Sequence, residues 1–143
     1  MIPTRITTVH LGVHDVPKLR AFYNALGWTE ANPDNKHFAE YKGGGAWLSL
    51  FPHALLSGDA KLTDAPPAAG QYRGLSLGLN VERREQVDEA LATAKAAGGR
   101  IVKEPVDTSW GGRSGYFADP EGNLWEMAWS PRSQFDARGG LIA

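Results

Sequence analysis

The chain has 143 residues, with 15 Lys and Arg against 16 Asp and Glu and no cysteine. This length suits one domain with its own core. The balanced, scattered charge predicts no nucleic-acid partner, and the lack of cysteine excludes disulfides, thiolate metal ligands and cysteine nucleophiles. No apolar run reaches the ~20 residues of a membrane helix, and the first residues do not resemble a signal peptide. We therefore expect a cytoplasmic protein without membrane contact.

The first half of the chain predicts one strand, one helix and three further strands. Residues 6–13 alternate between apolar and small or polar side chains, which is typical of a strand. Asp15 is suited to cap a helix whose apolar residues recur every three or four positions until Gly27. Further strands are expected at 28–31, 37–42 and 46–51. The first module, βαβββ, ends near residue 52.

The second half repeats this plan. We interpret residues 53–72 as a linker, because this segment is rich in Pro, Gly and Ala. The second module covers about residues 73–131, and a C-terminal tail follows at 132–143. Its predicted elements are a strand to Val81, a helix to Gly98 and strands at 100–103, 113–118 and 124–130. The chain is thus predicted to be a single α+β domain of two βαβββ modules.

One face of each predicted sheet is too polar and too small to be core. A helix covers the apolar face, so the opposite face is left for other uses. Its predicted residues include Thr8, His10, Ser76, Asn80, Ser114, Tyr116 and Glu126. Small side chains leave room above a sheet, which favours a ligand cavity. The alternative is a polar face that is simply solvated.

Two segments resemble a known family. Residues 8–28 resemble the opening of a vicinal oxygen chelate module, and residues 115–126, Gly-Tyr-Phe-Ala-Asp-Pro-Glu-Gly-Asn-Leu-Trp-Glu, resemble its closing hairpin. This superfamily includes glyoxalases, bleomycin-resistance proteins and extradiol dioxygenases. The resemblance implies paired modules with curved mixed sheets around a cavity, helices outside, and a homodimer.

The resemblance also implies metal-ligand positions, and most of them carry poor ligands here. The corresponding residues are Thr8, Leu48, Ser76 and Glu126. Only Glu126 binds a divalent ion well, whereas a catalytic metal normally has three protein ligands. His10 and His14 are about 13 Å apart along a strand, too far to share an ion. We expect no cofactor and disfavour Ni, Zn, Mn or Fe, although a register shift of two residues would bring His10 into a ligand position.

Glu126, His10 and Tyr116 are the candidate catalytic residues. Glu126 lies between apolar neighbours, so we expect burial to raise its pKa and make it a proton acceptor; the alternative is a structural pair with Arg113. His10 suits proton exchange or substrate orientation, or is a structural histidine. Tyr116 matches a position where related transferases contact substrate, and its phenol either donates to a ligand or fills space.

Further substrate contacts are expected from several other residues. Trp110 lies in a glycine-containing loop, where it either closes over a flat ligand or anchors the loop. The remaining predicted contacts are Thr8, Leu48, Ser76, Asn80 and Ser114. The sequence assigns no role to His14, His37 or His53.

Three functions fit this pattern. The first is metal-independent binding of a small, partly apolar organic molecule, by a sequestering or carrier protein; the near-neutral charge argues against bleomycin itself. The second is a lyase or isomerase of the glyoxalase type, with Glu126 as general base. The third is a dimeric interaction module with a vestigial cavity. Fold alone does not decide among them.

Overall fold

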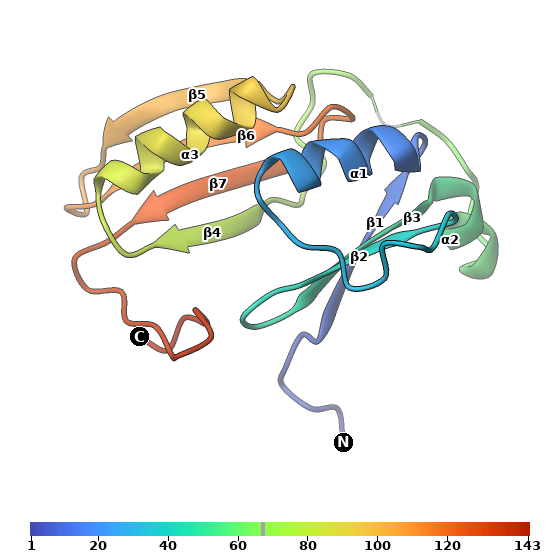
Figure 1. Ribbon diagram of the computed structural model, residues 1–143, viewed down its shortest axis with the longest axis horizontal. Coiled ribbons are helices and arrows are strands. Elements are labelled where there is room, and N and C mark those ends of the chain that lie inside the picture. The colour runs from blue at the N-terminus through green and yellow to red at the C-terminus, as the bar shows by residue number, and fades with distance from the viewer. Residues whose placement is uncertain (67) are drawn as a thin grey trace. The chain divides into compact units, whose positions relative to one another are not determined.

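The computed structural model describes residues 1–66 and 68–143, which divide into two compact units (Figure 1). Unit 1 contains Met1–Ala65 and Phe135–Gly140, and unit 2 contains Pro66–Gln134 and Leu141–Ala143. Each unit has its own mixed sheet, so the predicted α+β architecture of two modules is confirmed. No helix in the described part of the chain has the length and apolar character needed to span a bilayer.

Unit 1 is built on a three-stranded sheet of order β1-β3-β2. Strand β1 (Thr8–Val13) runs parallel to β3 (Trp47–Pro52), and β2 (Ala39–Lys42) is antiparallel to β3. The predicted strand at 28–31 is reduced to a single bridge between Glu30 and Tyr41. That expectation was wrong because a turn at residues 32–35, closed by the hydrogen bond from Asn35 N–H to the Asn32 carbonyl, follows directly after the bridge.

Helix α1 (Val16–Ala25) begins as the sequence predicts. The carboxylate of Asp15 accepts a hydrogen bond of 2.9 Å from the backbone N–H of Lys18, which caps the helix. Gly27 follows the helix with φ +90°, a conformation that favours glycine. The buried side chains of α1 and of the sheet face beneath it form the core: Leu11, Val13, Val16, Leu19, Phe22, Tyr23, Ala39, Tyr41, Leu48 and Leu50.

The expected linker begins with a helix, α2 (His53–Asp59). The sequence interpretation missed it because the composition of the whole segment was dominated by prolines that lie further along. Ala54, Leu55 and Leu56 are good helix formers, and Pro52 precedes the helix, where it does no harm. Pro67, which also contributed to the linker interpretation, lies outside the described residues. None of the residues of α2 is buried.

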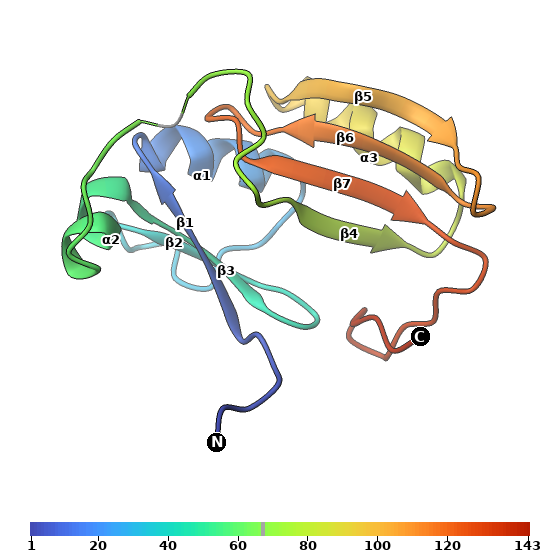
Figure 2. The same cartoon turned by 180° about the vertical axis from the view of Figure 1, so that it is seen from behind.

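Unit 2 has a four-stranded sheet of order β4-β7-β6-β5. Strand β4 (Leu77–Val81) is parallel to β7 (Leu124–Trp129), and β6 (Arg113–Ala118) pairs antiparallel with both β7 and β5 (Arg100–Asp107). Helix α3 (Glu85–Ala96) covers one face of the sheet. The view from behind shows the opposite face, with α3 on its far side (Figure 2). Val87, Leu91 and Ala94 face the sheet core, which includes Phe117, Trp125 and Met127.

The turn between β6 and β7 is fixed by one buried carboxylate. Asp119 is 3% exposed and accepts hydrogen bonds from the backbone N–H groups of Glu121 and Asn123 and from the Asn123 side chain. Gly122 adopts φ +85° at the corner. This turn sets the register of β6 and β7, and therefore the position of Glu126 opposite Tyr116.

Candidate functional site

The position of Gly115 shows which face of the unit 2 sheet is covered by α3 and which face is open. A Cβ atom at Gly115 would lie 3.0 Å from Leu91 of α3, so Gly115 and its register partner Met127 face the helix. Side chains alternate along a strand, so Tyr116 and Glu126 face the other way. The residues on this open face include Gly78, Asn80, Ser114, Tyr116, Glu126 and Ala128.

Tyr116 and Glu126 form a hydrogen-bonded pair on that face. They are register partners on β6 and β7, and the Tyr116 hydroxyl donates to the Glu126 carboxylate. Burial, followed by the bond to Glu126 and its charge, raises the pKa of Tyr116 above its usual range. Lys103, the register partner on β5, has its ammonium nitrogen 5.8 Å from the Tyr116 ring centroid. An acceptor, a donor and a cation are therefore adjacent.

There is free space beside this pair. Gly78 is the register partner of Glu126 on the other side of β7, and a Cβ there would meet no atom within 4 Å. Asn80 is exposed and Ser114 is buried, both on the same face. Glu126 itself is half-buried. The arrangement can hold a small molecule through one or two oxygen atoms and exchange a proton with it.

The open face of the unit 1 sheet is more aromatic. His10 packs edge-on against Phe51 with ring centroids 5.5 Å apart, and Phe51 stacks on Phe38 at 4.8 Å. Glu40 is also on this face, where Asn32 donates to it at 3.0 Å and Ser49 at 3.4 Å. The sequence reasoning missed Glu40, Phe51 and Phe38 because strand 39–42 is short and its register is set by β3.

The residues at the implied metal positions do not fit a metal ion. Leu48 pairs with Val9 and is 7% exposed on the face toward α1, whereas Thr8 pairs with Trp47 on the open face. The expectation that Leu48 lines a site with Thr8 is therefore corrected. Ser76 is exposed just before β4. Within residues 1–66 and 68–143, no group of three His, Asp or Glu side chains is arranged to hold an ion.

The proposed structural pair of Glu126 with Arg113 is wrong. Arg113 and Tyr116 are an odd number of residues apart on β6, so their side chains face opposite sides of the sheet. Arg113 therefore lies on the helix side. Its guanidinium binds both oxygens of Asp88 at 2.7 Å and also Asp107 at 3.1 Å. Its partners come from α3 and β5, whereas Glu126 accepts its hydrogen bond from Tyr116.

Trp110 packs on its own loop. A Cβ on Gly112 would lie 1.7 Å from Cζ3 of Trp110, so the indole rests directly on the glycine backbone. Thr108 closes the loop by accepting from Gly112 N–H at 3.0 Å. The indole is 45% exposed. The structure thus shows Trp110 in contact with its loop, and its stacking on a ligand stays a prediction.

Two further histidines lie at the end of the unit 1 open face. The ring of His53 lies over Gly12, and it stacks on His14 with centroids 4.8 Å apart. Its Nδ1 atom is 2.5 Å from Oδ1 of Asp64. The sequence signal for this cluster is Gly12 itself, a glycine inside a strand, which often marks a close approach by another segment.

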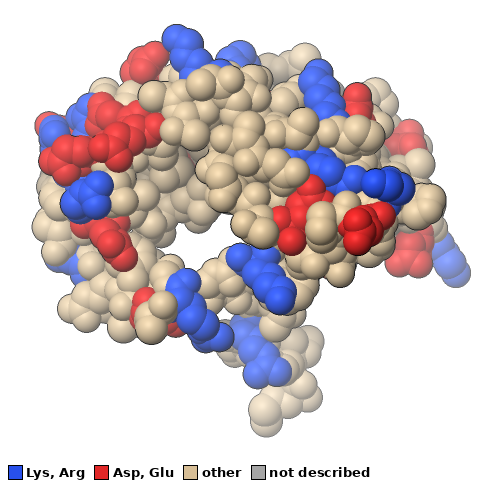
Figure 3. All heavy atoms as spheres, in the orientation of Figure 1, with Lys and Arg blue, Asp and Glu red and all other residues tan. Residues whose placement is uncertain are grey.

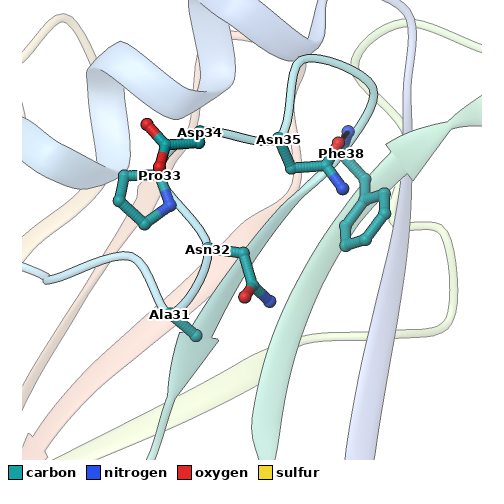
Figure 4. Close-up of a pocket in the computed structure, with 6 residues that line it drawn as sticks. All are labelled: Ala31, Asn32, Pro33, Asp34, Asn35 and Phe38. Carbon is teal, nitrogen blue, oxygen red and sulfur yellow. Dashed lines mark hydrogen bonds between the residues drawn. The ribbon is translucent and has the colours of Figure 1, made fainter.

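A surface hollow of about 620 Å³ lies at the loop before β2, lined by Ala31, Asn32, Pro33, Asp34, Asn35 and Phe38 (Figure 4). Its polar groups mostly serve the loop. Asn35 Oδ1 accepts from the N–H of His37 and Phe38, and Arg20 donates to two carbonyls of the same loop. On the face shown in Figure 3, acidic and basic side chains are interspersed.

Comparison with known proteins gives a consistent family. A sequence model described as the Glyoxalase/Bleomycin resistance protein/Dioxygenase superfamily matches residues 5–127. A glyoxalase-related enzyme from Fulvimarina pelagi has a similar structure, with a TM-score of 0.88 and 25% identity over 99% of both chains. A family enzyme from Burkholderia phytofirmans PsJN reaches 0.75 at 22% identity, over 88% of this chain and 98% of that one. Lactoylglutathione lyase from Agrobacterium tumefaciens reaches 0.64 at 20%, over 90% and 95% respectively. No curated protein sequence matches significantly.

Proposed function

Because this chain belongs to the glyoxalase/bleomycin resistance protein/dioxygenase superfamily, we propose that it binds a small, partly apolar organic molecule without a metal ion. The observation that carries this proposal is the Tyr116–Glu126 pair beside the open space at Gly78. A phenol and a carboxylate give a ligand one donor and one acceptor, and small neighbours leave room for its apolar part. By family resemblance we further propose a cytoplasmic homodimer.

The donor set supports the metal-independent part of this proposal. Of the four implied ligand positions, Thr8, Leu48 and Ser76 carry side chains that bind divalent ions poorly, and Leu48 faces the core. Elemental analysis of purified, untagged protein should find no stoichiometric metal. A thermal-shift series with Ni, Zn, Mn and Fe(II) should leave the melting temperature unchanged. A stoichiometric ion, or a rise of several degrees with one of them, would falsify metal independence.

Ligand binding is tested with a panel of small aromatic alcohols and hydroxyketones, whose hydroxyl group can donate to Glu126, first by thermal shift and then by calorimetry. We expect one molecule per chain and no product after long incubation. Glu126→Gln should weaken binding about 10-fold or more, because a hydrogen bond to a charged group contributes roughly 1.5–3 kcal/mol. Glu89→Gln on α3, whose carboxylate is 66% exposed, is the matched control and should bind normally. Equal affinity in both variants removes Glu126 from the binding site.

The same pair supports an enzymatic alternative, a lyase or isomerase of the glyoxalase type. Glu126 would remove a proton next to a carbonyl, and Tyr116 would turn its hydrogen bond from Glu126 to the developing oxyanion. Here Glu126→Gln should abolish turnover while binding survives. Lactoylglutathione is a suitable first test compound, since one structural relative is named as its lyase. Unaltered turnover in Glu126→Gln rejects this mechanism.

A further inference from the structure

The histidine cluster of unit 1 brings together three chain segments. His14 follows β1, His53 is the first residue of α2, and Asp64 lies after that helix. The two imidazole rings stack with an interplanar angle of 19°. The side chain of His53 is 27% exposed, so it is sheltered but can be reached from solvent. None of these residues belongs to the proposed binding site around Glu126.

The backbone is adapted to this contact at two points. A Cβ on Gly12 would lie 3.0 Å from Cδ2 and 3.3 Å from Cα of His53, so a larger residue here would require the start of α2 to move away by a few tenths of an ångström. Lys61 has φ +57°, a left-handed conformation that is uncommon for lysine, at the turn that returns the chain toward His53. Because α2 has no buried residue, core packing does not account for this arrangement. Lys61 is the C′ residue of a Schellman motif, in which Leu62 N–H donates to the Ser57 carbonyl and Lys61 N–H to the Gly58 carbonyl, and this motif ends α2 and turns the chain.

The contact with Asp64 defines the chemistry of His53. An ionised carboxylate only accepts hydrogen bonds, so Nδ1 of His53 carries the proton in the 2.5 Å contact. In the neutral ring the lone pair is then on Nε2, which becomes the proton acceptor. Asp64 therefore orients the imidazole so that Nε2 points away from the carboxylate, as an oriented carboxylate does in other histidine pairs.

An aromatic surface adjoins the pair. Gly12, which lies under the His53 ring, is the register partner of Phe51 on β3. Phe51 in turn contacts the rings of His10 and Phe38 on the same open face. A flat apolar ring can pack against this row while its polar group reaches the histidine.

We propose that the His53–Asp64 pair binds molecules with an acidic hydroxyl, a phenol or an enol, and accepts their proton. The O–H bond of the ligand breaks and an N–H bond forms on Nε2, which leaves a phenolate or enolate beside the imidazolium. No electrons are exchanged with a third group. His53 contacts the ligand, and Asp64 is a positioning residue that acts through His53. This site goes beyond the proposed function and does not depend on Glu126.

The probe is 4-nitrophenol, whose ionised form is yellow. At a pH just below the pKa of free 4-nitrophenol, addition of the folded protein should turn the probe yellow. The colour should saturate at one probe molecule per chain. His53→Gln should abolish the colour change. Asp64→Asn should weaken it about 10-fold or more, because a hydrogen bond to a charged group is lost. It should also shift the imidazole nitrogen NMR signals of His53, since the tautomer is no longer fixed. His37→Gln, at an exposed position on another segment, should behave as the parent.

Thermal melts establish that each variant is folded. Should His53→Gln fail to fold, Asp64→Asn with its NMR readout decides the matter. Absence of the colour change in the parent protein, or an unchanged one in Asp64→Asn, overturns the proposal. If Glu126→Gln abolishes the colour change while Asp64→Asn leaves it intact, the probe occupies the Glu126 site, and the histidine proposal fails while the proposed function stands.

Discussion

The two units repeat one plan, but the ion pairs that hold their helices in place differ in burial. In unit 1 the guanidinium of Arg20 faces the carboxylate of Glu30 at 3.1 Å, where the side chains are 17% and 5% exposed. In unit 2 the corresponding fastening is Arg113 with Asp88, whose carboxylate is 50% exposed. Removing one partner of a charge pair that is shielded from water lowers the free energy of unfolding much more than removing one partner of a pair at the surface.

The unit 1 pair is the centre of a larger polar network. Asn24 donates to Glu30 at 2.8 Å, and the Tyr41 hydroxyl donates to Asn24 at 2.9 Å. Arg20 Nε and Glu30 Oε2 are buried and face each other as an ion pair, although the angle between them does not make a hydrogen bond. Burial and then the charge of Glu30 raise the pKa of Tyr41 well above its usual range. The network ties α1 to the loop before β2.

The largest expected effect comes from breaking this buried pair. Arg20→Met leaves the Glu30 carboxylate buried without a counter-charge and removes the bonds to the carbonyls of Asn35 and Phe38. The free energy of unfolding should fall by about 3–5 kcal/mol, measured by urea denaturation. In the double variant Arg20→Met with Glu30→Met, most of this loss should be recovered, because no buried charge remains. A double variant as unstable as the single one contradicts the assignment.

A smaller effect is expected at the β5–β6 loop of unit 2. Gly112→Ala places a methyl group 1.7 Å from the Trp110 ring and 2.4 Å from the Trp129 carbonyl, and the carbonyl cannot move aside easily. Overpacking of this kind costs roughly 1–3 kcal/mol. Gly45→Ala in unit 1 is the matched control, since a Cβ there meets nothing within 4 Å. Equal stability of both variants in urea would contradict the close packing of Gly112 against the Trp110 ring and the Trp129 carbonyl.

The sequence predicted the elements with strong periodicity. Strands β6 and β7 and helices α1 and α3 follow from alternation, capping and helical spacing, which are local properties. The bridge at Glu30 and helix α2 did not follow, because they depend on contacts with distant residues or were obscured by neighbouring prolines. The residue match at β3 was also wrong: the family resemblance assigned Leu48 to the ligand face, and a shift of one residue along a strand moves its side chain to the other face.

The candidate site was predicted only in part, for a similar reason. Tyr116 and Glu126 were singled out separately, from strand alternation and from the family resemblance. Their pairing depends on the turn at Asp119, which sets the register. The contact of His53 with Asp64 requires the chain to reverse at Lys61, a lysine in a left-handed conformation. Nothing in the residue type of Lys61 signals that reversal.

The smallest expected effect is the acid sensitivity of the unit 2 fastening. The hydrogen bonds from Arg113 hold the pKa of Asp88 below its ordinary value, and those from Arg84 and then Arg113 do the same for Asp107. A carboxyl whose pKa is lower in the folded state contributes stability that is present above the unfolded pKa and lost as the pH falls through the folded pKa. The protein should therefore lose this contribution below about pH 4.

In the parent protein the urea midpoint should fall as the pH decreases from about 5 to about 3. This acid limb should be flatter in Asp88→Asn. Arg113→Met removes the same bonds from the other side and should flatten the limb in a similar way. Because the two residues share one interaction, the double variant should add little to either single one. High salt should weaken the effect in the parent protein, since Asp88 and Asp107 are exposed. Additive losses would mean that the two residues act on separate parts of the unit, and that α3 is not fastened through this contact.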